Sequence, residues 1–326
     1  MSEMCVQIDI PEDRCVELFS TADALDSCHR AFLHYGSGTI ENPPRSEEVR
    51  QSDGMDLFRL DMPAEWPGTY RARKCIEERS DVASGRLAAR QAYIELEDVP
   101  RGSLVRLDAG HITDLRTGAA GALGLQYMAT RAIRRLAILG TGRVARTLAL
   151  ACDTLFELTE IRCTSRNQEK RDAFARQMSS KLRASLHMTE TQSECLQGVD
   201  ALLTAVPTPL PILDVADVEQ IDYLVIVGGD GRTRQVESLV LERRSVVVDL
   251  LEQAEKSGEF RWARSQQAAT EFNLVRADDG RALTIGDAAH GRVRMPRGCV
   301  YLTGLAVQDL CAAAVVYERW RARSAT

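Results

Sequence analysis

The chain has 326 residues, with 41 basic and 47 acidic side chains for a net charge of −6, and 44% of its residues are apolar. This is the composition of an ordinary globular chain of about two domains, large enough to bury a core without disulfides or metals. The acidic balance provides no basic surface for nucleic acid, and no apolar run approaches the ~18 residues that span a bilayer, so we expect neither partner.

The first part of the chain mixes helix and strand. An apolar stripe predicts a helix over residues 16–35, and a polar, proline-containing connection follows over residues 42–54. Short strand-like segments separated by Pro and Gly lie at residues 57–60, 92–96 and 103–107. A helix rich in Ala and Leu is predicted from about residue 114 to residue 129.

Beyond residue 135, strands alternate with helices. Strands are predicted at residues 136–140, 160–164, 200–206, 223–227 and 245–250. Helices are predicted at residues 143–151 and 170–181, and a Gly- and Arg-rich connection after about residue 282 leads to a last helix over 305–321. This alternation predicts a parallel, doubly wound sheet, hence an α/β protein.

A glycine motif follows the first strand of this alternating part. The run Gly140-Thr141-Gly142-Arg143-Val144-Ala145 opens a helix, which is the context that a dinucleotide-binding fingerprint requires. The first Gly permits a tight turn, the second lets the backbone approach the pyrophosphate, and Ala145 allows close helix packing. We therefore predict a Rossmann-type domain whose cofactor contacts include Gly140, Thr141, Gly142, Arg143 and Val144.

The end of the second strand bears on the choice of cofactor. It reads Thr164-Ser165-Arg166-Asn167, without the carboxylate that binds the ribose 2′-hydroxyl of NAD. Ser165 and Arg166 are suited to a 2′-phosphate instead. We expect Ser165, Arg166 and Asn167 to contact the cofactor, with NADP(H) favoured and NAD(H) left open, because Arg166 as a solvated loop charge is the alternative.

The run His111-Ile-Thr-Asp-Leu-Arg-Thr-Gly-Ala-Ala120, followed some twenty residues later by the glycine motif, resembles the ornithine cyclodeaminase and mu-crystallin family. Further segments match motifs of that family in the same order: Pro44-Arg45, Met62-Pro63, Lys74, Gly228-Gly-Asp230 and Val300–Asp309. The resemblance covers almost the whole chain. It implies a homodimer in which residues 1–128 and 300–326 form a discontinuous α+β substrate-binding and dimerisation domain around a Rossmann domain of residues 129–299.

The same resemblance implies the site residues. Arg45, Lys74 and Arg116 correspond to groups that hold the substrate carboxylate, a task that suits cations. Asp230 corresponds to the catalytic acid, and Lys74 is a second candidate for proton transfer. The expected cofactor contacts also include Ala205, Val206 and Thr303. Without the family, a solvated or structural role would be the better interpretation of each of these charges.

Members of the family act on amino or imino acids with a bound nicotinamide cofactor. One difference between this chain and the family's motifs bears on which of these reactions we expect. Ornithine-cyclising members carry an acid two positions before the Met-Pro pair, where this chain has Leu60. Asp61 is adjacent, but neighbouring side chains on a strand point to opposite faces. We therefore expect an NAD(P)H-dependent oxidoreductase of the ketimine reductase or amino acid dehydrogenase type, acting on the C–N bond of a small amino acid or its imine.

Two other functions stay open. One is an amino acid cyclodeaminase, acting on ornithine, lysine or diaminobutyrate with a recycled bound nicotinamide. The other is a non-catalytic nucleotide- and ligand-binding protein of the mu-crystallin type.

The N-terminus and the cysteines indicate the compartment. Residues 1–11 contain Glu3 and Asp9 and lack a basic segment followed by an apolar one, so no signal peptide is predicted. The nine cysteines are odd in number, scattered, and nowhere spaced as CxxC. We interpret them as reduced thiols of a cytoplasmic protein and expect no metal.

Overall fold

The computed structural model describes residues 6–82, 87–228, 231–265 and 272–324. Two compact units divide the chain: unit 1 comprises residues 1–116 and 305–326, and unit 2 comprises residues 117–304. The chain passes from unit 1 to unit 2 inside helix α3 (Gly110–Met128) and returns after Gly304.

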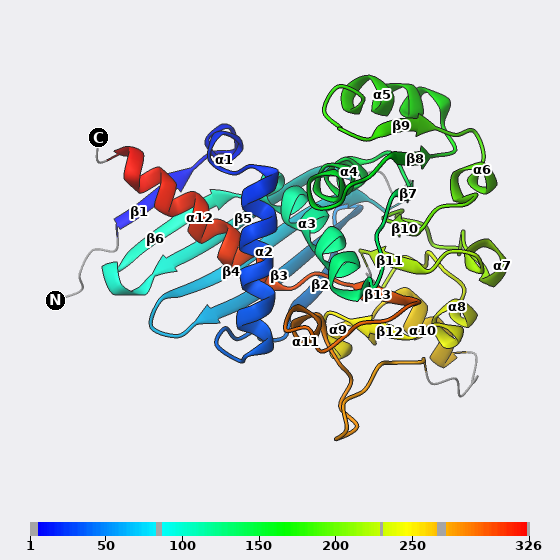
Figure 1. Cartoon of the computed structure of the whole chain (residues 1–326). Coiled ribbons are helices and arrows are strands. Elements are labelled where there is room, and N and C mark those ends of the chain that lie inside the picture. The colour runs from blue at the N-terminus through cyan, green and yellow to red at the C-terminus, as the bar shows by residue number, and fades with distance from the viewer. Residues whose placement is uncertain (1–5, 83–86, 229–230, 266–271, 325–326) are drawn as a thin grey trace. The chain divides into compact units, whose positions relative to one another are not determined.

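Unit 1 contains a six-stranded sheet of order β1-β6-β5-β4-β3-β2 (Figure 1). The strands are β1 (Val6–Ile10), β2 (Ser46–Ser52), β3 (Met55–Trp66), β4 (Tyr70–Asp81), β5 (Leu87–Asp98) and β6 (Ser103–Asp108). Neighbours are antiparallel, except that β1 runs parallel to β6. A sheet of this kind can bury one face and leave the other to solvent.

Helices cover the inner face of this sheet. They are α1 (Glu12–Leu18), α2 (Thr21–Gly36), the start of α3, and α12 (Ala306–Ser324), while a 3-10 turn, η1 (Val99–Arg101), connects β5 to β6. Ala72, Lys74, Ile94 and Leu96 alternate with more exposed residues and are buried, as a half-covered sheet requires. In Figure 1, α12 crosses the strands of this face, and α2 packs against α12. The last helix of the chain therefore completes the core that the first hundred residues begin.

Two expectations for unit 1 were wrong in detail. The helix expected over residues 16–35 is broken in two, because the Ser20 side chain accepts from the Asp23 amide while the Asp23 carboxylate accepts from the Ser20 amide, a capping box that starts α2. The connection expected over residues 42–54 contains β2, whose residues are all exposed. An edge strand without apolar alternation gives the periodicity nothing to detect.

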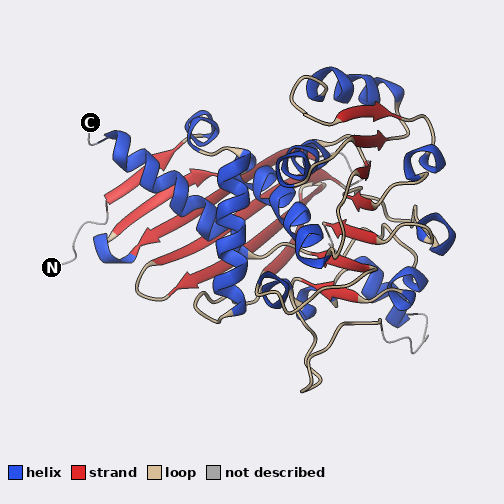
Figure 2. Ribbon diagram, viewed as in Figure 1, coloured by secondary structure: helices blue, strands red, loops and turns tan. Residues whose placement is uncertain are grey.

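Unit 2 contains the parallel sheet that the alternation predicts, whose strands are red in Figure 2; their order, with the labels of Figure 1, is β12-β13-β11-β10-β7-β8-β9. The strands are β7 (Arg135–Leu139), β8 (Glu160–Thr164), β9 (Ser185–Met188), β10 (Ala201–Thr204), β11 (Tyr223–Val227), β12 (Val246–Val248) and β13 (Gly298–Leu302). β7 and β10 are neighbours, and the order runs outward from them in opposite directions. This is the switch point at which doubly wound sheets bind ligands.

The helices of unit 2 separate these strands along the chain. They are α4 (Arg143–Leu155), α5 (Gln168–Met178), α6 (Gln192–Leu196), α7 (Val215–Val218), α8 (Ser238–Arg243), α9 (Leu251–Ala254), α10 (Gly258–Ser265) and α11 (Ile285–Ala289). Strands β10, β11 and β13 are buried along their whole length, as in a sheet covered on both faces. The α/β class with a Rossmann-type sheet and a second α+β unit is confirmed.

The described part of the chain contains no helix with the length and apolar character needed to cross a membrane. Its eight cysteines are buried free thiols.

Candidate functional site

Two buried cations of unit 1 meet at one carboxylate. The Lys74 Nζ and Arg116 Nε atoms donate to the same Asp309 Oδ1, over 3.1 Å and 3.0 Å respectively. The side chains of Lys74 and Asp309 are each 1% exposed and that of Arg116 is 8% exposed. Two cations around one anion leave this cluster with a net charge of +1.

Each member of the cluster comes from a different element. Lys74 lies on the inner face of β4 opposite Met62 of β3. Arg116 is in the part of α3 that belongs to unit 1, and Asp309 is in the first turn of α12, where a carboxylate is also favoured by the helix dipole. A buried charge without a partner destabilises the folded state, so burial of any one of these three side chains depends on the other two.

Burial changes the pKa of Lys74. It lowers the pKa of Lys74 from its ordinary value to about 7, with the nearby Arg116 charge acting in the same direction and Asp309 opposing both. Lys74 therefore exchanges its proton near neutral pH. A group of this kind can bind a carboxylate when protonated and transfer a proton during a reaction.

Asp309 was not among the predicted site residues, although it ends the Val300–Asp309 motif. Its Oδ2 atom is buried and has no hydrogen-bond partner in the described part of the chain. An acid in the first turn of a helix whose first half is otherwise mostly apolar is the sequence signal that points to it.

The register of the sheet locates Arg45. Ser46 pairs with Asp61, so Arg45 extends toward Met62, which in turn pairs with Lys74. At ~4.8 Å per strand, Arg45 stands about 10 Å from Lys74. Its side chain is 9% exposed and forms an ion pair with Glu47 at 3.1 Å. Lys74 and Arg116 are thus brought together directly, and Arg45 two strands away.

The outer face of the sheet holds Asp61. Its carboxylate accepts from Arg59 Nε, Arg73 Nε and Cys75 Sγ, each at 2.9 Å. Burial opposes its ionisation, but these hydrogen bonds outweigh burial and lower the pKa of Asp61 to about 2. The alternation of β3 places Leu60, not an acid, on the same face as Met62.

The glycine turn of unit 2 follows β7. Gly140 has a φ of +108°, a conformation that favours glycine, and Gly142 is the N-cap of α4 without a side-chain capping bond. A Cβ added at Gly142 would meet no atom within 4 Å. Open space at a helix N-terminus fits the pyrophosphate of a dinucleotide.

The end of β8 stands beside this turn. Thr141 Oγ1 donates to Ser165 Oγ over 3.1 Å, and Arg166 is exposed. Asn167 also has a structural role, since its Oδ1 caps α5 by accepting from the Lys170 amide at 2.9 Å. No carboxylate occurs in the run from Thr164 to Asn167.

Gln235 fixes the loop that contains Ala205 and Val206. Its Oε1 accepts from Thr204 Oγ1 at 2.9 Å and from the Val206 amide at 2.7 Å, and its Nε2 donates to the Val227 carbonyl at 2.9 Å. Val206 also approaches the glycine turn, because a Cβ at Gly140 would lie 3.4 Å from Val206 Cγ2. Gln235 thus ties the carboxyl ends of β10 and β11 together.

Thr303 follows β13. Its hydroxyl donates to Asp249 Oδ1 over 2.8 Å and accepts from Gln253 Nε2 over 2.8 Å. Asp249 Oδ2 accepts from the amides of Thr303 and Gly304 at 2.7 Å and 2.6 Å. Burial raises the pKa of Asp249 although these bonds oppose it. The structure therefore gives Thr303 a role in fixing the end of β13.

Asp230 lies outside the described residues, so its catalytic role stays a prediction. Gly228, the last described residue before it, has a φ of +98° and follows β11 directly. Within the described ranges, no group of three or more His, Cys, Asp or Glu side chains is placed to hold a metal ion.

A parallel sheet with a glycine turn at its switch point, joined to a second unit with a buried cationic cluster, defines a Rossmann-type dinucleotide-binding protein. The chain belongs to the ornithine cyclodeaminase/mu-crystallin family, whose profile matches residues 7–324. This confirms the resemblance that the motifs indicate.

Individual named proteins are similar to this chain over two thirds of its length or more. Alanine dehydrogenase of Archaeoglobus fulgidus is 27% identical over 317 residues, covering 95% of this chain and 94% of its own. Delta(1)-pyrroline-2-carboxylate reductase of Bacillus cereus is 25% identical over 232 residues, covering 69% of this chain and 70% of its own. The solved structure of an archaeal alanine dehydrogenase dimer with bound NAD has a TM-score of 0.80 at 24% identity, covering 98% of this chain and 97% of its own.

Proposed function

We propose that this protein is an NADP(H)-linked oxidoreductase that acts on the C–N bond of a small amino acid or its imine. The observation that carries the proposal is the pairing of Lys74 and Arg116 on Asp309, a buried cluster of net positive charge. Such a cluster suits the one feature that all α-amino and α-imino acids share, the carboxylate.

The chain's own residues have two tasks in this reaction. Arg116, Arg45 and protonated Lys74 bind the carboxylate and so fix the orientation of the neighbouring carbon, from which much of the rate enhancement follows. Reduction of an imine adds a hydride to carbon and a proton to nitrogen. Lys74 or Asp230 would supply the proton, and a nicotinamide dinucleotide held through its pyrophosphate at Gly140–Val144 would supply the hydride.

NADP(H) is proposed because of Arg166, although the related alanine dehydrogenase structure contains NAD. Replacing Arg166 by Ala removes the exposed cation beside Ser165 and should lower kcat/KM for NADPH about tenfold or more, with little change for NADH. Steady-state kinetics with both cofactors measure this. Equal losses for the two cofactors would exclude a 2′-phosphate contact.

The family's other activities are separated by product analysis. Purified protein, reduced cofactor and a panel of cyclic and linear α-imino acids should show loss of nicotinamide absorbance. Ammonia release from ornithine, lysine or diaminobutyrate without net cofactor consumption would instead identify a cyclodeaminase, a function that Leu60 argues against. Absence of turnover in either direction, with cofactor still bound, would sink the proposal.

The remaining alternative, a binding protein, is tested with Asp230→Asn. An enzyme should lose rate by orders of magnitude, whereas a binder should keep its ligand affinity. We further propose that the chain forms a homodimer through the domain of residues 1–128 and 300–326, with residues 129–299 holding the dinucleotide. Light scattering should then give twice the monomer mass of 36.1 kDa.

A further inference from the structure

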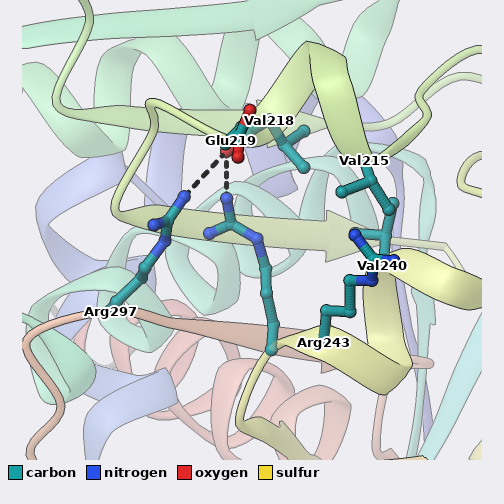
Figure 3. A pocket seen from close by; sticks show the side chains of 7 residues that line it. Val215, Val218, Glu219, Val240, Arg243 and Arg297 are labelled. Carbon is teal, nitrogen blue, oxygen red and sulfur yellow. Dashed lines mark hydrogen bonds between the residues drawn. The ribbon is translucent and has the colours of Figure 1, made fainter.

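Unit 2 has a cavity of about 180 Å³ that the proposed reaction does not use (Figure 3). Its charged lining consists of Arg243, Arg244, Arg297 and Glu219, and its apolar lining consists of Val215, Val218 and Val240. We propose that this cavity binds a dianionic phosphate group, free or as a monoester.

The cavity lies at the sheet edge opposite the glycine turn. Arg244 comes just before β12 and Arg297 just before β13, while Val218 and Glu219 come shortly before β11. These three strands are adjacent and parallel, so the residues that precede them lie side by side at the amino-terminal ends of the strands. The glycine turn follows the carboxyl end of β7, and the two sites are therefore distinct.

Arg244 supplies a buried positive charge. It is 5% exposed, and its guanidinium donates to the carbonyl oxygens of Asp222 at 3.2 Å, Ile221 at 2.8 Å and Val218. Burial lowers the pKa of Arg244 to about 10, so it stays charged at neutral pH. Carbonyls satisfy its donors but carry only partial charges, which leaves the full charge without an anion.

Arg297 adds a second guanidinium to the same carbonyl. Its NH2 group donates to the Val218 oxygen at 3.5 Å, so two like charges converge on one neutral acceptor, as the dashed lines of Figure 3 show. In the described part of the chain, none of the three arginines forms an ion pair with a carboxylate. Asp222, the nearest acid before β11, is instead paired with Arg131.

The charge balance selects the ligand. Three arginines and one glutamate give the lining a net charge of +2, which matches a phosphate dianion, the form that a monoester takes above its second pKa of about 6. A guanidinium group binds phosphate through two parallel N–H···O hydrogen bonds. Arg243 and Arg297 are exposed, so their N–H groups can reach a ligand. The three valines provide room beside the anion for the carbon portion of a monoester.

The test is isothermal titration of the full chain with inorganic phosphate at constant ionic strength. The double variant Arg243→Ala/Arg297→Ala removes two exposed side chains and should weaken binding about tenfold or more. The control Arg176→Ala/Lys181→Ala removes two exposed charges from α5 and the residues after it and should bind like the wild type. Phosphate held at the glycine turn would be retained by both variants.

Glu219→Gln makes the test independent of any folding defect, because it predicts a gain. Removing the one acid of the lining should tighten binding about fivefold. Equal binding by the wild type and the Arg243/Arg297 variant, an equal loss in the control, or no gain in Glu219→Gln would each overturn the proposal. A parallel titration with ethyl phosphate distinguishes a monoester, which binds tighter through the valines, from the free ion.

Discussion

Lys74 illustrates how one side chain sets the pH range of the proposed reaction. Because its pKa is about 7, protonated Lys74 is lost as the pH rises above neutrality. In the direction of imine reduction, carboxylate binding and proton donation both need that proton. We expect kcat/KM to fall about tenfold per pH unit above this pKa, since this parameter reports on the free enzyme.

Lys74→Arg is the control for that pH profile. Arginine keeps its proton, so the variant should be slower but should lack the descending limb near pH 7. A limb that persists unchanged in the variant would assign the titration to another group.

Asp309→Asn tests the coupling within the cluster. The carboxylate raises the pKa of Lys74, so the amide should move the descending limb to lower pH. It should also destabilise the fold by about 3–5 kcal/mol, because two buried cations lose their partner.

The stability of this variant has a definite pH dependence. A lysine whose pKa is lowered by folding holds fewer protons in the folded state than in the unfolded state, so folding becomes more favourable as the pH rises through that window. The gap in thermal stability between Asp309→Asn and the wild type should therefore be larger at about pH 6 than at about pH 8. A gap that is constant with pH would show that Asp309 does not act on Lys74.

The motifs predict Lys74 and Arg116 as site residues, but they do not predict that Asp309 is the partner of both, for a physical reason. Both cations were inferred from motifs whose order resembles a family, and motifs describe neighbours along the chain. Asp309 is separated by 235 residues from Lys74 and by 193 from Arg116. Only the packing of α12 on the sheet makes it their common partner.

At the scale of elements, two glycines of unit 2 serve different purposes. A Cβ at Gly118 of α3 would lie 2.4 Å from the backbone carbon of Thr147 in α4, whereas one at Gly142 would meet nothing. We expect Gly118→Ala to lower the free energy of unfolding by about 1–3 kcal/mol through overpacking. Gly142→Ala should leave stability unchanged and abolish dinucleotide binding, because its Cβ would fill the space that the pyrophosphate needs.

Thermal unfolding and cofactor titration of both variants measure this difference. If Gly142→Ala still binds the dinucleotide with wild-type affinity, the open space beside α4 is not the phosphate site. The pair also separates helix packing from ligand binding, which a single glycine variant does not.

Elements differed in how well the sequence predicted them. The apolar run of β11 is buried along its whole length and predicted the bounds of that strand, because continuous burial leaves a strong signal. The exposed edge strand β2 and the charged strand β4 carry none, and they form by pairing with β3. Pairing partners decide such strands, and a single sequence does not state them.

At the scale of the whole molecule, the two units differ in how they are built from the chain, because unit 2 is continuous and unit 1 is formed from two separate segments. All seven strands and the glycine turn of unit 2 lie within residues 117–304, whereas unit 1 needs both ends of the chain. Its sheet is covered by α12, which also contributes Asp309. Each large apolar side chain that α12 protects is worth about 1.5–3 kcal/mol.

Ending the chain at Gly304 should therefore unfold one unit and spare the other. The truncated protein loses the helix that packs on β3, β4 and β5, and with it the only carboxylate that accepts from both Lys74 and Arg116 in the described part of the chain. We expect limited proteolysis to degrade unit 1 and leave a resistant fragment close to residues 117–304, identified by mass spectrometry. A truncated chain that resists proteolysis throughout would show that the first 116 residues hold their sheet without α12, and that Asp309 is dispensable for burying the two cations.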